Sequence, residues 1–327
     1  MQNIGSLFSD DFLIPTICDR SVTNSEPEAP PSSSQGLRVR KGKVNSLEFA
    51  NMKAQEARAR LENPNYEQTV LELVLPDWSE LFRGVPNGFL RSGLFTARSK
   101  SIRNDIKGVR IASLSNFDVF YKGEELRQDD LSVWIALMTR AKKQPLGDKI
   151  FFVAYSLIKD LGWSLNSVSY ARVKACIERL KLTSLKIGSK DQKSAYVGSL
   201  IRDFAYDLED EQGNASWMIR LEPEIAKLFV NDSTTFLEWE ERKALGTRST
   251  LAQWLHGYFS SHTIPIPISI MKIHELCESG QKSLPNFKIR VRQALEQLVS
   301  SGCLQRYVIT DEMVHVTKSP RRLRLCD

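Results

Sequence analysis

The chain has 327 residues, of which 42% are hydrophobic and 26% charged, and its formal net charge is +6. That length accommodates about two domains of ordinary size together with tails. No apolar run reaches the roughly 18 residues that span a bilayer, and the N-terminus lacks the pattern of a secretory signal, so we expect a cytoplasmic protein without membrane contacts.

The first 36 residues differ in composition from the rest. They contain five acids against one arginine, a net charge of −4, so the other residues carry +10. Residues 19–36 are rich in Ser, Pro and Glu, which is typical of a disordered linker, and residues 1–18 form an acidic and apolar island. We predict that residues 1–36 are a flexible acidic tail. Its island is either a peptide ligand for another protein or a frayed terminus.

Residues 37–64 are predicted to form a basic segment followed by a helix. Gly36 and Gly42-Lys43 are one residue too far apart for a P-loop, and no Ser or Thr follows the lysine, so we exclude nucleotide binding there. Ser46 is a good N-cap for a mostly polar helix over Leu47–Glu62. This helix either packs on the protein body or lies along DNA.

Residues 65–230 are predicted to form a first domain. Its early strands are expected to add an antiparallel sheet that supports dimerisation. These strands are Tyr66–Leu75, Phe89–Ala97 and Gly108–Ser113. A hairpin follows, in which Phe117–Tyr121 turns at Lys122-Gly123 into Glu124–Arg127. Two longer helices are predicted: Asp130–Lys143, which Asp129 or Asp130 caps, and Ser167–Lys181. Between them, Lys149–Gly162 is predicted to form a strand that leads into a short helix. Further strands are Thr183–Ile187, Tyr196–Leu208 and Ala215–Leu221, and Pro223–Phe229 closes the domain.

Residues 247–327 are predicted to form a second domain. Helices Ser249–Ser261 and Ser269–Glu278 precede a third helix that ends before Ser300-Ser301-Gly302. The third helix has an apolar stripe at helical spacing, formed by Phe287, Val291, Ala294, Leu295 and Leu298. Two alternating runs, Cys303–Thr310 and Met313–Thr317, then predict a hairpin. A helix with a basic outer face followed by a hairpin is typical of a winged helix-turn-helix.

An internal repeat supports a second copy of this unit. Arg172–Leu180 aligns without gaps with Arg290–Leu298, with identical Arg, Val, Glu and Leu. Both segments precede predicted hairpins and follow shorter helices. We therefore predict an α+β fold with tandem winged-helix domains, an extra antiparallel sheet on the first and a disordered N-terminal tail.

The outer face of the last helix carries the candidate DNA contacts. Arg290 or Arg292 could pair with guanine, and Asn286 or Gln293 with adenine. Phosphate contacts are expected from Lys288, Arg306 and Lys318. The first copy offers Arg172, Lys174 and Arg179 but fewer base-reading groups, which predicts a weaker DNA contact or a dimer surface. The alternative is a solvated basic face.

Catalytic and metal motifs are absent from the sequence. The chain has five cysteines, an odd number, and no Cys-x-x-Cys pair. His274-Glu275 lacks the second histidine of a His-Glu-x-x-His motif. His256 and His274 lie on predicted helices, where a hydrogen-bonded structural histidine is more common than a ligand. We predict no catalytic residue, no metal and no cofactor, and take the protein to be no enzyme.

Two stretches, Leu81–Ala97 and Tyr121–Leu137, resemble the TrfA family of plasmid replication initiators, and the resemblance extends from about Leu75 to the C-terminus. It implies winged-helix domains that bind direct repeats (iterons) at a plasmid origin, help to open an adjacent A+T-rich region and recruit host replication proteins. The implied partners are double-stranded and single-stranded origin DNA, the host helicase, the host initiator and the β sliding clamp. The family also implies self-association in a monomer–dimer equilibrium, through which plasmid copy number is controlled.

Family members carry a clamp-binding pentapeptide of the Gln-Leu-Ser-Leu-Phe kind. The nearest match here is Ile4–Phe8, in which Ser6, Leu7 and Phe8 agree and the first two positions depart. Two alternatives to an initiator stay open: a winged-helix transcriptional repressor, and a replication or partition docking protein that does not read sequence.

Overall fold

The computed structural model describes residues 75–320, apart from 100–101, 112, 114–116, 143, 190–194, 210–214 and 230–233. The predicted tail (1–36), the basic segment and helix (37–64) and nearly all of the strand Tyr66–Leu75 therefore lie outside the described residues. Within the described part, no helix has both the length and the apolar character needed to cross a membrane.

A first series of elements has the order helix, strand, helix, helix, strand, strand. These elements are α3 (Gln128–Ala141), β4 (Lys149–Phe152), α4 (Ala154–Asp160), α5 (Ser167–Leu182), β7 (Asp203–Glu209) and β8 (Ala215–Arg220). Their strands form an antiparallel sheet in the order β4-β8-β7. The apolar positions of α5, from Val173 to Leu180, are buried.

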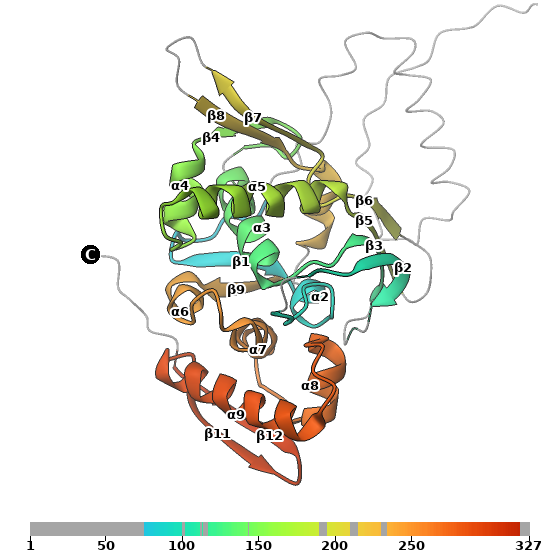
Figure 1. The fold of residues 1–327 in the computed structure, drawn as a ribbon, viewed down its shortest axis with the longest axis vertical. Helices are drawn as coiled ribbons and strands as arrows, with labels where there is room; N and C mark the ends of the chain where they lie inside the picture. Colours follow the sequence, from blue (N-terminus) through green and yellow to red (C-terminus); the bar gives the residue numbers. More distant parts are fainter. Residues whose placement is uncertain are drawn as a thin grey trace, which may run out of the picture. The chain divides into compact units, whose positions relative to one another are not determined.

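A second series repeats this order. Its elements are α7 (Thr250–Ser260), β10 (Ile268–Ser269), α8 (Ile270–Cys277), α9 (Leu284–Ser300), β11 (Leu304–Thr310) and β12 (Met313–Lys318). The strand order is β10-β12-β11, which corresponds strand by strand to β4-β8-β7. Figure 1 shows α9 lying along the β11–β12 hairpin and α7 between α9 and the elements of the first series. The repeat at Arg172–Leu180 and Arg290–Leu298 thus lies on two helices at equivalent points of the two series.

The described strands outside the two series form two further sheets. An antiparallel sheet in the order β2-β3-β5-β6 is made of β2 (Asp105–Ile111), β3 (Phe117–Glu124), β5 (Ser184–Ser189) and β6 (Ala195–Gly198). A two-stranded sheet pairs β1 (Phe82–Pro86) with β9 (Thr234–Glu238), and α6 (Trp239–Ala244) follows directly. The 3-10 helix η2 (Pro223–Leu228) precedes β9.

Three strand predictions are wrong. Phe89–Ala97 is not a strand: the helical turn α2 (Asn87–Leu90) opens it, and isolated bridges at Ser92 and Thr96 follow. The predicted hairpin at Lys122-Gly123 does not form, because β3 continues to Glu124 between β2 and β5. Gly123 permits this path with φ 139°, a backbone conformation that other residues rarely adopt. The predicted strand Tyr196–Leu208 is divided between β6 and β7.

Helix α3 begins two or three residues earlier than the predicted caps require. Its N-cap is Arg127, and Asp130 occupies the third helical position of a capping box. The backbone N–H of Arg127 donates to the Asp130 carboxylate at 2.8 Å. The predicted N-cap role of Asp129 or Asp130 is therefore wrong, although Asp130 does contribute to the cap from inside the helix.

Two hydrophobic clusters fill the described unit. The larger contains Trp134 of α3, which packs edge-on against Phe89 and stacks on Phe229. The smaller contains the whole predicted stripe of α9, whose five residues are all buried. Burial of an apolar helix face of this size is what fixes α9 against α7 and α8.

Residues 92–98, which we call the linking segment, hydrogen-bond to both series. The N–H of Thr96 donates to the Leu126 carbonyl at 2.9 Å, just before α3, and the Gln128 side chain of α3 donates to the Phe95 carbonyl at 2.7 Å. On the other side, the N–H of Ala97 donates to the Cys277 carbonyl of α8 at 2.8 Å. The Thr250 hydroxyl donates to the Ala97 carbonyl at 2.7 Å. Because the bonds are divided between the two sides, the segment cannot pair as a strand with either.

Candidate nucleic-acid interface

The outer face of α9 carries most of the residues predicted to contact DNA. Ser283 is the N-cap, and Pro285 lies in the first turn, where its missing N–H costs nothing. With the apolar stripe buried, Asn286, Arg292 and Gln293 are exposed, and Arg290 is half-buried at the flank. The structure thus brings these four side chains onto one helix, on its solvent side.

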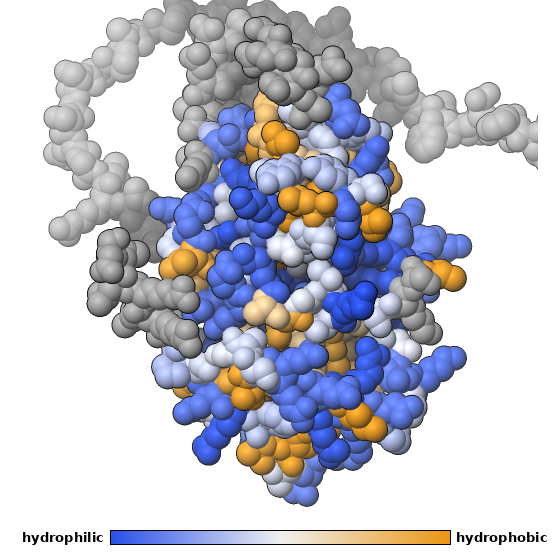
Figure 2. All heavy atoms as spheres, turned by 60° about the vertical axis from the view of Figure 1, so that its left-hand side comes forward, coloured by the Kyte–Doolittle hydropathy of each residue, from blue (hydrophilic) through white to orange (hydrophobic). Residues whose placement is uncertain are grey.

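The two arginines of this face are available for a ligand. In the described part of the chain, neither Arg290 nor Arg292 forms a hydrogen bond or an ion pair. A guanidinium without protein acceptors keeps all five of its N–H donors for another molecule. Figure 2 shows the surface over the C-terminal elements, at the bottom of the picture, as mainly hydrophilic with separate hydrophobic spots.

The β11–β12 hairpin lies beside this helix. Its turn, Asp311-Glu312, has positive φ values of 50° and 65°, the conformation of a tight hairpin turn. Lys288 of α9 forms an ion pair with Glu312, so one predicted phosphate contact is already engaged with the hairpin. The Nε of Arg306 donates to the Thr317 hydroxyl at 3.3 Å across the hairpin, and Arg306 stays exposed.

Lys318 has a different environment from the other predicted contacts. Its ammonium donates to the carbonyls of His262 at 2.8 Å and Ser260 at 3.4 Å, at the C-terminus of α7. A cation there satisfies carbonyls that the helix leaves unpaired and interacts favourably with the helix dipole. The geometry gives Lys318 a structural use within the second series.

The cations of α5 are engaged with other side chains. The guanidinium of Arg172 lies 4.2 Å from the ring centre of Trp163 and 3.3 Å from Asp129, and the Lys174 ammonium lies 3.3 Å from the ring centre of Tyr206. Arg179, expected on the outer face, instead points inward to Asp130 at 2.9 Å. The outer face of α5 therefore offers fewer free donors than that of α9.

A buried ionic network fixes α5 against α3. Asp130 is fully buried between Arg103, at 2.6 Å, and Arg179. Burial acts to raise the pKa of Asp129, but the charges of Arg103 and Arg172 outweigh it and hold that pKa below its usual value. Burial, with the nearby Asp130 charge, keeps the pKa of Cys176 well above that of a free thiol. Three arginines already neutralise this acidic cluster, so it does not need a metal.

A second cluster in the described part joins Glu241, His256 and Cys303, whose ligand atoms all lie within 4.8 Å of one another. His256 is buried as a structural histidine would be, but neither of its ring nitrogens has a hydrogen-bond partner, and Nε2 is 3.5 Å from Glu241. Burial lowers the pKa of His256 and outweighs the neighbouring Glu241, which acts to raise it; the charges of Arg242 and Lys318 lower it further. Zinc accepts this donor set, whereas two neighbouring cations disfavour a divalent ion. The absence of a metal therefore stays a prediction.

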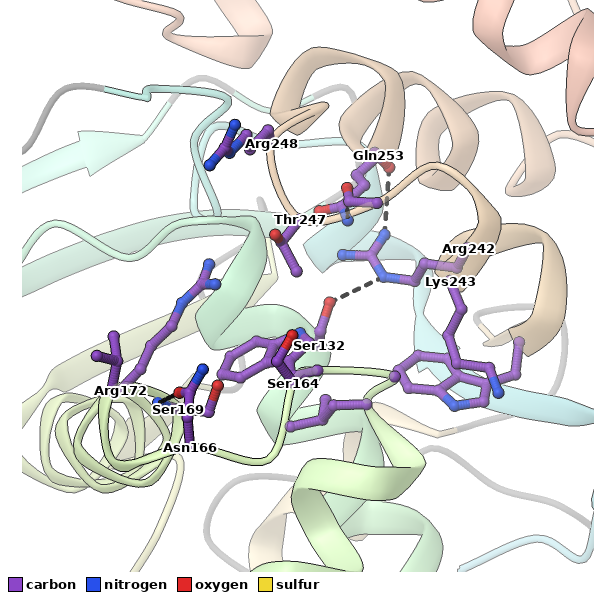
Figure 3. Close-up of a pocket in the computed structure, with 16 residues that line it drawn as sticks. Ser132, Ser164, Asn166, Ser169, Arg172, Arg242, Lys243, Thr247, Arg248 and Gln253 are labelled. Atoms are coloured by element: carbon purple, nitrogen blue, oxygen red, sulfur yellow. Dashed lines mark hydrogen bonds between the residues drawn. The ribbon is translucent and has the colours of Figure 1, made fainter.

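Sequence reasoning missed a basic cavity of about 600 Å³ at the N-terminus of α5, which we call the α5 cavity. Its charged lining residues are Arg172, Arg242, Lys243 and Arg248 (Figure 3). Arg172 comes from α5, whereas the other three come from α6 and the turn after it, about 70 residues later in the sequence. A cluster of this kind is visible only once the chain is folded.

Comparison with known proteins gives consistent matches. A sequence model of the family described as "TrfA protein" matches residues 54–318. The plasmid replication initiator protein TrfA of Escherichia coli is 32% identical over 241 residues, which are 73% of this chain and 62% of that protein. The match thus spans less than two thirds of the relative's length.

Two solved structures of domains 2 and 3 of RctB also align. One is 13% identical with a TM-score of 0.48, over 72% of this chain and 98% of that chain. The other is 12% identical with a TM-score of 0.45, over 68% of this chain and 94% of that chain.

Proposed function

Since the chain belongs to the TrfA family, we propose that it is a plasmid replication initiator that binds direct-repeat iterons at a plasmid origin. The observation that carries this proposal is the outer face of α9. Asn286, Arg292 and Gln293 are exposed there beside an exposed hairpin, and the guanidinium of Arg292 is unpaired within the described residues. Arg and Asn or Gln are the side chains best suited to the base edges of the major groove.

We propose that the two series are tandem winged helices, within residues 65–230 and 247–327. Their shared element order and their equivalent strand orders support this assignment. A winged helix inserts its last helix into the major groove and places its hairpin against the DNA backbone. In the second series these parts are α9 and the β11–β12 hairpin.

The two units would contribute unequally to DNA binding. Arg172 and Lys174 of α5 already contact Trp163 and Tyr206, whereas Arg292 of α9 has no such partner in the described chain. This supports α9 as the main source of base contacts, with Arg306 contacting phosphate. Arg172 and Lys174 would add a weaker, sequence-independent contribution.

The wider task of an initiator is part of the same proposal. The protein would act in the cytoplasm, without catalysing a reaction, by opening an adjacent A+T-rich region and engaging single-stranded origin DNA. It would recruit the host helicase, the host initiator and, through Ser6, Leu7 and Phe8, the β sliding clamp. Self-association would use the β2-β3-β5-β6 sheet, which exposes the hydrophobic side chains of Phe120 and Val197.

DNase footprinting on the DNA that flanks its gene tests the proposal. We expect several protected segments of the same sequence, spaced regularly and in the same direction. Absence of any discrete protected segment would contradict iteron binding and favour a docking protein that does not read sequence. Permanganate sensitivity of thymines beside the repeats then separates an initiator, which opens the duplex, from a repressor, which does not.

A further inference from the structure

The α5 cavity lies where five helices meet, namely α3, α4, α5, α6 and α7. The turn after α4 contributes Trp163 and Ser164, the first turns of α5 contribute Ser169 and Arg172, and α3 and α7 contribute Ser132 and Gln253. The chain from α6 to α7 closes the remaining side. A cavity of about 600 Å³ is within the usual size range of small-molecule sites.

The charge of the lining has one sign. Four cations line the cavity, and none of the described lining residues is Asp or Glu. Two of the cations have acidic partners outside the lining, since Arg172 contacts Asp129 and Lys243 pairs with Glu240. Arg248 is exposed and has no partner in the described chain.

Arg242 is the feature that most requires an explanation. Its side chain is only 1% exposed, and its hydrogen-bond acceptors in the described chain are all neutral: the Ser132 hydroxyl at 3.1 Å, the carbonyls of Gln253 and Gln128 at 3.2 Å, and the Gln128 side-chain oxygen at 3.1 Å. No carboxylate in the described part of the chain forms an ion pair with it. Burial alone lowers the pKa of Arg242 to about 10, so the group keeps its charge at neutral pH.

A buried charge without a counter-ion carries a large desolvation penalty, which an anion in the adjacent cavity would offset. Neutral donors are also available to that anion. The hydroxyls of Ser164, Ser169 and Thr247 line the cavity, and α5 begins there with Asn166 as its N-cap (Figure 3). Helix N-termini favour anions because their first N–H groups lack intrahelical acceptors.

We propose that the α5 cavity is a binding site for a phosphate group, with Arg242 as its buried charge and Arg248 and Arg172 as its outer cations. Two sources share this chemistry: a backbone phosphodiester of bound DNA, and a free phosphate such as that of a mononucleotide. The first source rests on the proposed function. The second does not.

The binding experiment uses the full chain, with inorganic phosphate and dAMP as probes in titration calorimetry. Arg248→Ala removes an exposed cation and leaves the core intact, and Arg202→Ala removes an exposed cation outside the cavity as a matched control. We expect Arg248→Ala to weaken binding of the probe by roughly ten-fold. The Arg202→Ala chain should bind like the unaltered one.

The same chains titrated with random-sequence duplex DNA at several salt concentrations decide the source. A backbone phosphate in the cavity predicts that Arg248→Ala lowers the slope of log affinity against log salt by about one. An unchanged slope with weakened dAMP binding assigns the site to a free phosphate. If Arg248→Ala matches Arg202→Ala in both titrations, the proposal is overturned.

Arg242→Met tests the buried charge itself. Phosphate should raise the melting temperature of the unaltered chain and leave that of this variant unchanged. An equal rise in both would contradict the role of Arg242. Failure of the iteron proposal remains distinguishable, because Arg292→Ala should leave the binding of inorganic phosphate unchanged.

Discussion

Arg179 of α5 reaches the fully buried carboxylate of Asp130 on α3 at 2.9 Å. Arg103 approaches the same carboxylate from the β2 side at 2.6 Å. The two arginines therefore attach α5 and the chain just before β2 to one acidic residue of α3. Loss of the Asp130 carboxylate should therefore lower the stability of the fold, which can be measured.

Removing the shared carboxylate should destabilise the protein strongly. Asp130→Ala leaves Arg103 and Arg179 largely buried without their common partner, and breaking a buried pair in this way costs about 3–5 kcal/mol. Urea unfolding followed by tryptophan fluorescence measures the loss. Arg202→Ala, an exposed control, should stay within about 0.5 kcal/mol of the unaltered chain. A loss below about 1 kcal/mol in Asp130→Ala would show that the network is dispensable.

Arg292→Ala should weaken binding to the repeated site while leaving stability unchanged. A bidentate contact with guanine contributes about 1–3 kcal/mol of discrimination, so affinity for the specific duplex should fall by about 10- to 100-fold, with little change for random DNA. Arg306→Ala is the matched comparison, because losing a phosphate contact weakens both duplexes alike. Fluorescence anisotropy with the two duplexes measures the difference. Equal effects of Arg292→Ala on both duplexes would exclude base readout by this residue.

Lys318→Ala should affect folding more than DNA binding. The ammonium donates to the carbonyls of His262 and Ser260. A hydrogen bond from a charged group stabilises the folded state by about 1.5–3 kcal/mol. We expect a lower free energy of unfolding and an unchanged salt slope for duplex DNA. A slope reduced by about one, with stability retained, would instead make Lys318 a phosphate contact.

The buried His256 should make stability depend on pH. Burial lowers its pKa in the folded protein below the ordinary value of 6.5, so the unfolded chain binds the extra proton first. Its contribution to stability is complete above pH 6.5 and is lost as the pH falls below that value. The measurement is the difference in melting temperature between the unaltered chain and His256→Gln from pH 5 to 8. That difference cancels the contribution of His262, whose pKa is lowered in the same direction by burial. A difference that does not vary with pH would show that the pKa of His256 is the same in the folded and unfolded chains.

Deletion of residues 1–36 should separate clamp binding from DNA binding. The tail carries Ser6, Leu7 and Phe8 and a net negative charge, so its removal should leave affinity for the iteron nearly unchanged and weaken binding to the β clamp. Surface plasmon resonance with each partner measures both. Leu7→Ala with Phe8→Ala in the full chain is the sharper variant. An equal loss of DNA affinity on deletion would show that the tail takes part in DNA binding.

Local patterns predicted the elements of the second series well. The stripe from Phe287 to Leu298, the stop before Gly302 and the hairpin after it all depend on residues close together in sequence, and each was found within a residue or two. Periodicity also placed α5 correctly. It could not place Arg179, because a cation at the flank of the stripe turns inward only when a buried acid such as Asp130 is there to receive it.

The remaining errors arise from contacts between distant residues. Strands β1 and β9 pair Phe82 with Glu238, and neither strand has a pattern that identifies the other. Residues 89–97 alternate like a strand, yet their hydrogen-bond partners, Leu126 and Cys277, lie on opposite sides. The α5 cavity was missed for the same reason, since Arg172 and Arg248 approach each other only in the folded chain.

Under the proposed function, the linking segment would also limit how the protein reads a repeat. Residues 92–98 hydrogen-bond to both series, so α5 and α9 cannot change their separation without breaking bonds such as that from Ala97 to Cys277. One base pair inserted in the middle of a repeat turns one half of the duplex by about 34° against the other. A chain with a long flexible tether between its two halves would tolerate that rotation. Under the proposed function, the spacing tolerated within a repeat would be set by this segment and by Arg242, which hydrogen-bonds to Ser132 of α3 and to Gln253 of α7.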